Sequence, residues 1–327
     1  MTHAMFRRCV PDNRRGRAAG LARAVLTASL CASTALGAEA TSPQAPDAAS
    51  DAASTAPTAM TPPVSAPPVA SAPAAPLPAS IAAAVADPRR SAANVTRDVY
   101  RHPLQTLTFF EVTPATKVVE IYPSGGWYTE ILAPLLKASG IYYAAVPWVE
   151  PGVALARGDG LKRFQALLAT DPARFDAVRL TALAPPDHTA IAPPGTADLV
   201  LTFRNVHNWL ANGTADDMFA AFFVALRPGG LLGVVEHRAA QGTSVEQMKT
   251  SGYVTEEEVI SRATKAGFEL AGRSETNANP RDTKDYPKGV WTLPPSLTLG
   301  AQDLARYQAI GESDRMTLKF KKPGSSP

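Results

Sequence analysis

The fold of this chain is most constrained by residues 117–132, which read KVVEIYPSGGWYTEIL. Val118, Val119 and Ile121 form a short β-branched run, typical of a strand buried on both faces of a parallel sheet. Turn-forming residues follow, and from Trp127 apolar residues recur at the spacing of one helical face. The stretch therefore predicts a strand, a tight glycine turn and a helix. In an open α/β sheet such a turn can present helix amides to a ligand, or it can be an ordinary connection.

The first forty residues have the features of an export signal. Six arginines give this segment positive charge, a run of small and apolar residues extends from Ala24 to Leu36, and Ala38-Glu39-Ala40 matches an A-x-A cleavage site. The apolar run is too short for a comfortable membrane span. We therefore predict a signal peptide at residues 1–40, export to the periplasm, and no stable membrane span after cleavage. A disordered basic tail is the alternative interpretation.

Both cysteines of the chain, Cys9 and Cys31, lie in this leader. The mature chain would then contain neither a disulfide nor a thiolate metal site. Without residues 1–40 the chain keeps 26 of its 32 basic residues and 27 of its 29 acidic residues, a net charge of −1. This balance gives no sign of nucleic-acid binding, and it leaves the oligomeric state open.

From Thr41 to about residue 80 the chain consists almost entirely of Ala, Pro, Ser and Thr. Such a segment cannot bury enough apolar surface to offset the entropy of ordering, so we predict a disordered linker at residues 41–80. Residues 81–327 remain, which is enough for one α/β domain with a complete core.

Strands and helices alternate along residues 81–327, which argues for a doubly wound, mostly parallel sheet. Five strands are expected at residues 117–121, 141–146, 177–180, 197–203 and 231–236. Two more, at 268–273 and 315–321, are joined by a long segment without a clear crossover helix, so we predict an antiparallel last strand. Before the first strand we expect one helix from Ser91 to His102 and a short one over Leu104 to Phe110.

This order of elements and several motifs together resemble the class I S-adenosylmethionine-dependent methyltransferase family. The motifs are VVEI with its glycine turn, TFRNVHNW, GVVEHR and DYPKGVWTLPP. More narrowly, they resemble a bacterial group of predicted, often exported methyltransferases. The resemblance covers residues 87–323. It implies a Rossmann-like, seven-stranded sheet, S-adenosylmethionine as the cofactor, and methyl transfer to a small-molecule acceptor.

The resemblance implies that the cofactor binds at the first turn. The family's acidic residue at the end of strand one falls on Glu120. Its glycine loop falls on Tyr122, Pro123, Ser124, Gly125 and Gly126. The usual G-x-G-x-G pattern reads Y-P-S-G-G here, so the last glycine of the pattern is kept and the first two are replaced. The acid that usually holds the ribose at the end of strand two is missing, and Glu150 is the nearest carboxylate.

Polar residues follow the fourth predicted strand in the run RNVHNW, residues 204–209. Doubly wound sheets place ligand sites at this edge. We expect Arg204 and Asn205 to contact the cofactor and Trp209 to contact the acceptor. His207 is a candidate general base, because an imidazole can accept a proton near neutral pH. A structural histidine that bonds the loop backbone is the alternative.

A second polar cluster, Glu236-His237-Arg238, ends the fifth strand at the same edge. A carboxylate there can orient an imidazole or raise its pKa, so Glu236 and His237 join His207 as catalytic candidates. An internal salt bridge, such as one between Arg204 and Glu236, is the alternative. The three candidates could also converge on a metal, but the sequence has no local H-x-x-H or H-x-x-x-H pair, and we predict no metal site.

After the sixth strand, residues 277–288 form a long polar loop. Long loops in compact domains are usually functional or disordered. We expect Arg281, Asp285 and Tyr286 to recognise the acceptor, and a solvated loop that covers the sheet edge is the alternative.

The sequence thus favours an S-adenosylmethionine-dependent methyltransferase that acts on a small molecule. The second hypothesis is an exported binding protein or pseudoenzyme that keeps the methyltransferase scaffold without methyl transfer. The leader favours this second hypothesis, because the methyl donor is made in the cytoplasm. A hydrolase fits less well, because the chain has no G-x-S-x-G motif.

Overall fold

The computed structural model describes residues 76–148 and 159–324, which all belong to the compact unit Ala70–Pro327. The predicted signal peptide, most of the predicted linker, both cysteines and Glu150 lie outside these residues. Within them, no helix combines the length and the apolar character needed to cross a bilayer.

Seven strands form one mixed sheet in the order β3-β2-β1-β4-β5-β7-β6. They are β1 (Lys117–Ile121), β2 (Ile141–Pro147), β3 (Arg179–Leu183), β4 (Ala197–Phe203), β5 (Leu226–His237), β6 (Glu269–Ser274) and β7 (Arg315–Lys321). The first five pair in parallel, and β7 runs antiparallel between β5 and β6. This confirms the predicted fold class, a doubly wound, Rossmann-like sheet with an antiparallel last strand.

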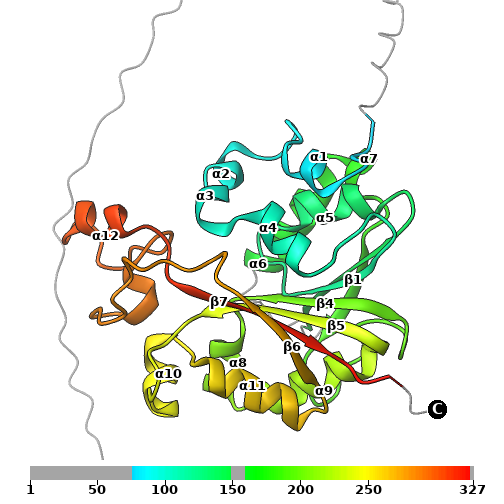
Figure 1. The fold of residues 1–327 in the computed structure, drawn as a ribbon. Coiled ribbons are helices and arrows are strands. Elements are labelled where there is room, and N and C mark those ends of the chain that lie inside the picture. Colours follow the sequence, from blue (N-terminus) through cyan, green and yellow to red (C-terminus); the bar gives the residue numbers. More distant parts are fainter. Residues whose placement is uncertain (1–75, 149–158, 325–327) are drawn as a thin grey trace, which may run out of the picture. The chain divides into compact units, whose positions relative to one another are not determined.

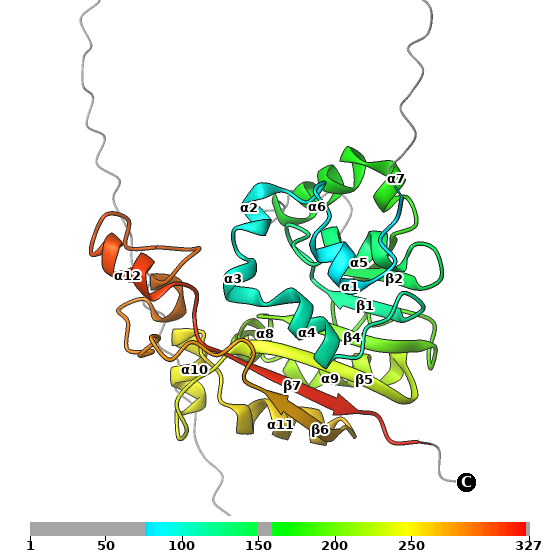
Figure 2. The ribbon, with the colours of Figure 1, turned by 45° about the horizontal axis from the view of Figure 1, so that its top comes forward.

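Helices lie on both sides of the sheet (Figures 1 and 2). One side carries α1 (Ile81–Val85), α2 (Ala92–Val95), α3 (Asp98–Arg101), α4 (Pro103–Phe109), α5 (Thr129–Leu136), α6 (Asp159–Thr170) and α7 (Pro172–Phe175). The other side carries α8 (Val206–Asn212), α9 (Ala215–Ala225), α10 (Val245–Ser251) and α11 (Glu256–Lys265). Successive strand residues face opposite sides, so Val118 joins one core cluster and Val119 the other.

The segment between β6 and β7 lies at the edge of the sheet where the parallel strands end (Figures 1 and 2). It contains the 3₁₀ helix η1 (Gly289–Thr292) and α12 (Leu304–Ile310). A third, smaller apolar cluster, which includes Tyr253, Tyr286 and Tyr307, packs beneath it. The long loop is therefore an ordered cover with a core of its own.

Several predicted elements differ from the structure, and the fifth strand begins at Leu226, five residues earlier than predicted. The single helix expected from Ser91 to His102 is divided into α2 and α3, and the Asn94 carbonyl at this interruption accepts a hydrogen bond from Trp127 Nε1 at 2.9 Å. The third strand begins two residues later than predicted. Its first residue paired with β2 is Arg179, which lies opposite Tyr143.

Candidate functional site

The centre of the sheet contains a topological switch point between β1 and β4. The chain continues from β1 toward β2 on one side and from β4 toward β5 on the other. This reversal opens a crevice at the carboxyl ends of the two strands, where ligands bind in such folds. Asn205 bridges the strands there, because its Nδ2 donates to the Ile121 carbonyl at 3.1 Å and to the Thr202 hydroxyl at 3.2 Å. Asn205, a predicted cofactor residue, thus positions the two loops that border the crevice.

The turn after β1 has left-handed backbone wherever the family pattern has glycine. The φ angle is 50° at Tyr122, 53° at Ser124 and 77° at Gly126. Residues with a side chain adopt this conformation at a cost of about 1–2 kcal/mol each, which persists when the surrounding structure requires it. Ser124 and Gly125 are exposed, and a Cβ at Gly125 would meet no atom within 4 Å. The turn therefore has the glycine-type shape and an open outer side, although two glycines are replaced.

The Tyr122 side chain packs against and hydrogen-bonds to other residues of the fold. Its ring lies 6.4 Å from that of Trp209, edge to face, and its hydroxyl donates to the Leu183 carbonyl at 2.9 Å. Burial raises the pKa of Tyr122 to about 12, so the phenol keeps its proton. Pro123, next in the predicted cofactor loop, is buried as well.

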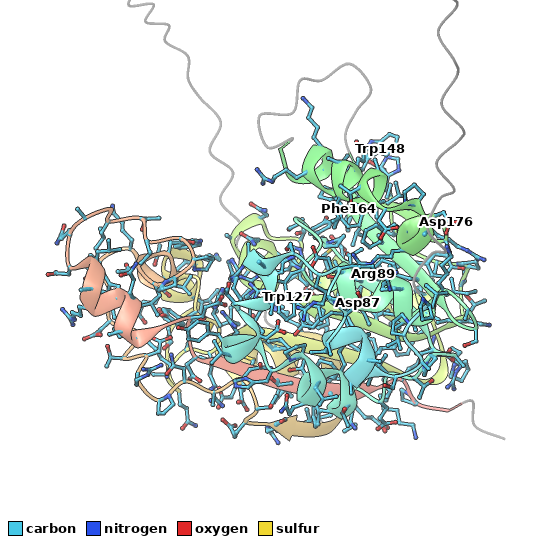
Figure 3. The ribbon with its side chains drawn as sticks, turned by 90° about the horizontal axis from the view of Figure 1, so that it is seen from above. Asp87, Arg89, Trp127, Trp148, Phe164 and Asp176 are labelled. Atoms are coloured by element: carbon cyan, nitrogen blue, oxygen red, sulfur yellow. The ribbon has the colours of Figure 1, made fainter. Side chains whose placement is uncertain are left out.

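An aromatic pair lies at the ends of β2 and β3. The Trp148 backbone N–H donates to the Leu183 carbonyl at 3.3 Å, and the exposed indole stacks on His188 with 4.1 Å between ring centroids. Figure 3 shows Trp148 at the margin of the molecule, whereas the buried Trp127 lies among the central side chains. Aromatic faces of this kind hold nucleobases by stacking. The open turn and this pair fit a nucleoside cofactor, but the described end of β2 offers no carboxylate for a ribose.

Glu120, the predicted acidic residue of the cofactor site, lies near the end of β1 with a buried carboxyl group. It accepts a hydrogen bond from the Tyr142 hydroxyl at 2.5 Å, and the Thr129 hydroxyl lies 2.8 Å from that phenol oxygen. Burial raises the pKa of Glu120 to about 7, although the Tyr142 hydrogen bond and the charge of Arg101 oppose the rise. Because Thr129 is the first residue of α5, Glu120 supports the turn from inside.

Glu236 and His207 form a buried pair between β5 and α8. Glu236 is fully buried, and its Oε1 lies 3.0 Å from His207 Nδ1. The carboxylate also accepts from the backbone N–H of His237 at 2.8 Å and from that of His207 at 3.3 Å. With Nδ1 donating to Glu236, the imidazole keeps Nε2 as an acceptor. The salt bridge considered between Arg204 and Glu236 does not form, because the carboxylate pairs with His207 instead.

His237 lies beside this pair, with 5.4 Å between the two imidazole centroids. Its Nδ1 is 2.5 Å from Ser313 Oγ. Burial, together with the charges of His207 and Arg315, holds the pKa of His237 well below its ordinary value, so the ring is neutral. Potential ligand atoms of His207, Glu236 and His237 all lie within 4.8 Å of one another, an arrangement that could hold a metal ion. Sequence spacing did not indicate this, because the three side chains come from two separate elements.

The run after β4, expected to be a loop, forms α8 from Val206 onward. Its buried residues are Val206, His207, Trp209 and Leu210, which share one helical face. The Trp209 ring, predicted to contact the acceptor, packs in the core against Phe219 and Phe222. The apolar spacing within the polar run was the signal that could have predicted this helix.

The three acceptor residues predicted in the long loop differ in burial. Arg281 and Asp285 are exposed, whereas Tyr286 is buried in the third apolar cluster. Asp282, which the sequence did not single out, fixes the loop because its carboxylate accepts from the Tyr253 hydroxyl at 3.0 Å. It also accepts from a backbone N–H just before β7, at 2.7 Å.

A cavity of about 560 Å³ lies beside this loop. Tyr286 and Trp291 contribute to its lining, and the Trp291 ring lies 6.0 Å from the His207 ring. Trp291 therefore borders the cavity and neighbours His207.

Sequence reasoning missed a cluster of arginines at the same edge. Its members are Arg97, Arg101, Arg204 and Arg315, which gather near Glu312. Only the spacing of Arg97 and Arg101, one helical turn apart, hints at the cluster in the sequence. The other two come from the end of β4 and from β7, which the fold brings together.

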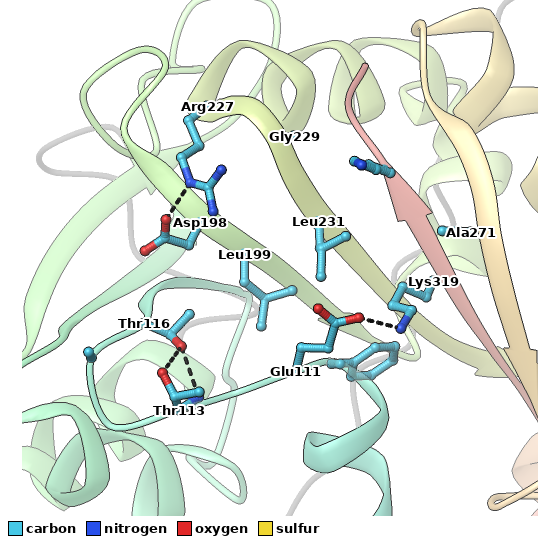
Figure 4. A pocket seen from close by; sticks show the side chains of 13 residues that line it. Glu111, Thr113, Thr116, Asp198, Leu199, Arg227, Gly229, Leu231, Ala271 and Lys319 are labelled. Atoms are coloured by element: carbon cyan, nitrogen blue, oxygen red, sulfur yellow. Dashed lines mark hydrogen bonds and ion pairs between the residues drawn. The ribbon is translucent and has the colours of Figure 1, made fainter. Parts of the chain in front are cut away.

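Another cavity, of about 530 Å³, lies at the opposite edge of the sheet, where β4 begins (Figure 4). Charged side chains in its lining pair with one another, Arg227 with Asp198 at 2.6 Å and Lys319 with Glu111 at 2.7 Å. Ligands of doubly wound sheets bind at the carboxyl ends of the strands, so this cavity is not the candidate site.

Structure comparison matches the chain to several solved proteins. A SAM-dependent methyltransferase from Aquifex aeolicus has 13% identity and a TM-score of 0.44, over 69% of this chain and 93% of that protein. A SAM-dependent methyltransferase from Methanosarcina mazei has 10% identity and a TM-score of 0.43, over 67% and 98%. The [4+2]-cyclase SpnF has 16% identity and a TM-score of 0.43, over 73% and 85%.

No protein-family model matches the chain, and no curated protein matches it either. The class of the fold therefore rests on the sheet itself. Its strand order and its antiparallel β7 are those of the class I methyltransferases.

Proposed function

We propose that this chain is an S-adenosylmethionine-dependent methyltransferase that acts on a small-molecule acceptor. The observation that carries the proposal is the left-handed backbone at Tyr122, Ser124 and Gly126. Two of these residues have side chains, so the turn keeps a costly conformation at the carboxyl end of β1. The sheet order and the polar pair at the ends of β4 and β5 also support the proposal.

When bound, S-adenosylmethionine supplies a methyl group on a positively charged sulfur. Transfer from sulfur is an in-line displacement, so the protein mainly aligns the acceptor and removes a proton where one must leave. His207 would take that proton at Nε2, because Glu236 holds Nδ1 at 3.0 Å. The imidazolium formed in this way would lie against the carboxylate of Glu236. His237, which stays neutral, adds no competing positive charge.

The acceptor would reach His207 from the cavity beside the long loop. Tyr286 and Trp291 line this cavity, and the Trp291 ring lies 6.0 Å from the imidazole. Arg281 and Asp285, exposed on the same loop, remain proposed contacts for the acceptor.

Calorimetric titration of the full chain with S-adenosylmethionine and with its demethylated product tests the proposal. Gly125→Trp should abolish binding, because it fills the open side of the turn at a position free of neighbouring atoms. Gly324→Trp is the matched control, since it adds the same side chain at an open position far along the chain. Binding by the wild type and by the control, but not by Gly125→Trp, would support the cofactor site.

The second candidate is a binding protein or pseudoenzyme on the same scaffold. It is favoured by the end of β2, where the described residues offer no acid for a ribose. A flat titration with both ligands at millimolar concentration would reject the methyltransferase proposal and leave this candidate.

The proposal extends to the location of the protein. The predicted leader at residues 1–40 supports export to the periplasm, and so does the resemblance of the motifs to those of a group of often exported bacterial methyltransferases.

A further inference from the structure

The cavity beside the long loop has the size of a small-molecule site. Its volume is about 560 Å³, and such sites range over roughly 300–1,000 Å³. Its described lining comes from the end of α10 and from residues 286–298 of the long loop. The part of this loop that contains η1 lies beside α10 (Figures 1 and 2). The cavity is therefore large enough for a ligand that contains a ring.

The wall formed by Trp291 is fixed by close backbone contacts. Gly252, at the end of α10, has a φ of 75°, and a Cβ there would lie 3.0 Å from the Trp291 ring. Gly289 has a φ of 52°, and a Cβ there would overlap the Ser251 carbonyl oxygen. The Trp291 carbonyl also accepts from the Thr298 N–H at 3.0 Å and from the Thr298 hydroxyl at 2.9 Å. Because both glycines let α10 and η1 approach closely, the indole is held in place before a ligand binds.

Flat, rigid side chains line the cavity on the side of the loop. They are Tyr286, Pro287 and Trp291. The Tyr286 ring is itself held edge to face by Tyr307, with 5.9 Å between the centroids. Aromatic faces bind other flat rings by offset stacking, and rigid walls lose little entropy when they do so. The lining therefore favours a ligand with an aromatic ring.

The unused polar groups of the lining are donors. Lys288 is the one charged residue of the described lining, and its ammonium group makes no hydrogen bond or ion pair with any residue that the structure describes. Trp291 Nε1 likewise has no acceptor among these residues. The Ser251 hydroxyl accepts from the Tyr253 N–H at 3.3 Å, and its own proton has no described acceptor. A ligand that complements this lining carries acceptors and negative charge.

We propose that this cavity binds an aromatic carboxylic acid. The ring would lie against Trp291 and Tyr286, and the carboxylate would pair with Lys288, whose ammonium group offers three N–H donors. The Trp291 ring is 6.0 Å from the His207 ring, so a ligand stacked on Trp291 lies near the proposed base. The inference deepens the proposed function, on which it rests only for the role of the bound acid as methyl acceptor.

Calorimetric titration of the full chain at low ionic strength tests the ring and the charge of the ligand separately. Benzoate has both features, benzamide keeps the ring without the charge, and acetate keeps the charge without the ring. We expect benzamide to bind about threefold more weakly than benzoate, because an exposed ion pair contributes little. Acetate should bind about tenfold more weakly than benzoate, because it cannot stack on the aromatic walls.

Two variants, each with a matched control, locate the binding. Lys288→Gln should weaken benzoate binding about threefold and leave benzamide binding unchanged. Lys162→Gln removes the same charge from the exposed side of α6 and should change neither. Trp291→Leu should weaken both ring ligands about tenfold, whereas Trp148→Leu removes an exposed indole elsewhere and should change neither. Thermal unfolding of all four variants verifies that they fold.

Several outcomes would overturn the proposal. They are equal binding of benzoate and acetate, benzoate affinity unchanged by both Lys288→Gln and Trp291→Leu, and no heat at high millimolar benzoate. Loss of benzoate binding in Trp148→Leu alone would place the ring on the other aromatic pair and would overturn it as well. Titration with S-adenosylmethionine tests the proposed function separately. Benzoate binding without cofactor binding would keep this site and reject the methyltransferase, and cofactor binding without benzoate binding would do the reverse.

Discussion

Gly126 has a conformational and a steric requirement for glycine. Its φ is 77°, and a Cβ there would lie 2.1 Å from Leu167 Cδ2 on α6. We expect Gly126→Ala to lower the free energy of unfolding by roughly 1–3 kcal/mol, since the left-handed backbone and the overpacking add. Denaturant unfolding measures the effect. Gly125→Ala, at the open neighbouring position, should change stability little, and an equal loss there would contradict the steric explanation.

Glu120 makes the stability of the fold depend on pH. Its pKa of about 7 exceeds the ordinary value of 4.5, so the folded chain binds this proton more tightly than the unfolded chain does. Stability should therefore fall as the pH rises from about 4.5 to about 7, by up to roughly 3 kcal/mol at about 1.4 kcal/mol per pKa unit. Glu120→Gln keeps an acceptor for the Tyr142 hydroxyl and should remove this decline. Unfolding curves across the pH range measure it.

The exposed Glu257 provides the control for this experiment. Glu257→Gln also removes one carboxylate, but it should leave the pH dependence as in the wild type. If Glu120→Gln instead loses stability only above about pH 7, then the carboxyl group supports the turn mainly as an ion, against our interpretation.

Glu236 is expected to orient the His207 ring. Glu236→Gln preserves the shape of the side chain but removes the negative charge 3.0 Å from Nδ1. If His207 is the base for methyl transfer, we expect kcat to fall by about a hundredfold, because general-base catalysis contributes about that much or more. Unchanged kcat would assign the pair a structural role.

At the scale of elements, the strands were the most predictable part of the fold. β1, β4 and β7 have the bounds that the sequence predicts, because buried β-branched runs and strict alternation are local signals. α8 was missed, since polar residues interrupt its apolar positions and made the run resemble a loop.

The candidate site was less predictable than the fold. The His207–Glu236 pair could be expected, because both residues belong to the carboxyl ends of parallel strands at one edge. The cluster of arginines near Glu312 could not be expected, because Arg101, Arg204 and Arg315 come from α3, the end of β4 and β7, and meet only through tertiary packing. Local sequence patterns report neighbours along the chain, whereas this site is made of neighbours across the sheet.

The junction of β1 and β4 depends on one amide. Asn205→Ala would remove the hydrogen bonds to the Ile121 carbonyl and the Thr202 hydroxyl, and we expect a loss of about 1–2 kcal/mol in unfolding free energy. Asn208→Ala, an exposed position on α8, is the control and should be close to neutral. Hydrogen exchange should show faster opening of the β1 and β4 ends in Asn205→Ala. Similar exchange in both variants would show that packing alone holds the junction.

At the scale of the whole molecule, export and thiol content are linked. The chain has two cysteines, Cys9 and Cys31, and both precede the proposed cleavage site after Ala40. The exported protein should therefore have no thiol, which suits an oxidising compartment. Intact-mass measurement of protein from the periplasm should show the loss of residues 1–40, and thiol labelling after denaturation should find none.

Replacing both Ala38 and Ala40 by Asp should block cleavage, because the site requires small residues at these positions. The uncleaved protein should keep residues 1–40 and label at two cysteines. Replacing Ala52 and Ala53, in the predicted linker, by Asp is the matched control and should leave processing intact. Full-length protein with two thiols in the cytoplasm of wild-type cells would reject export. It would also remove the main objection to methyl transfer, because the donor is made in that compartment.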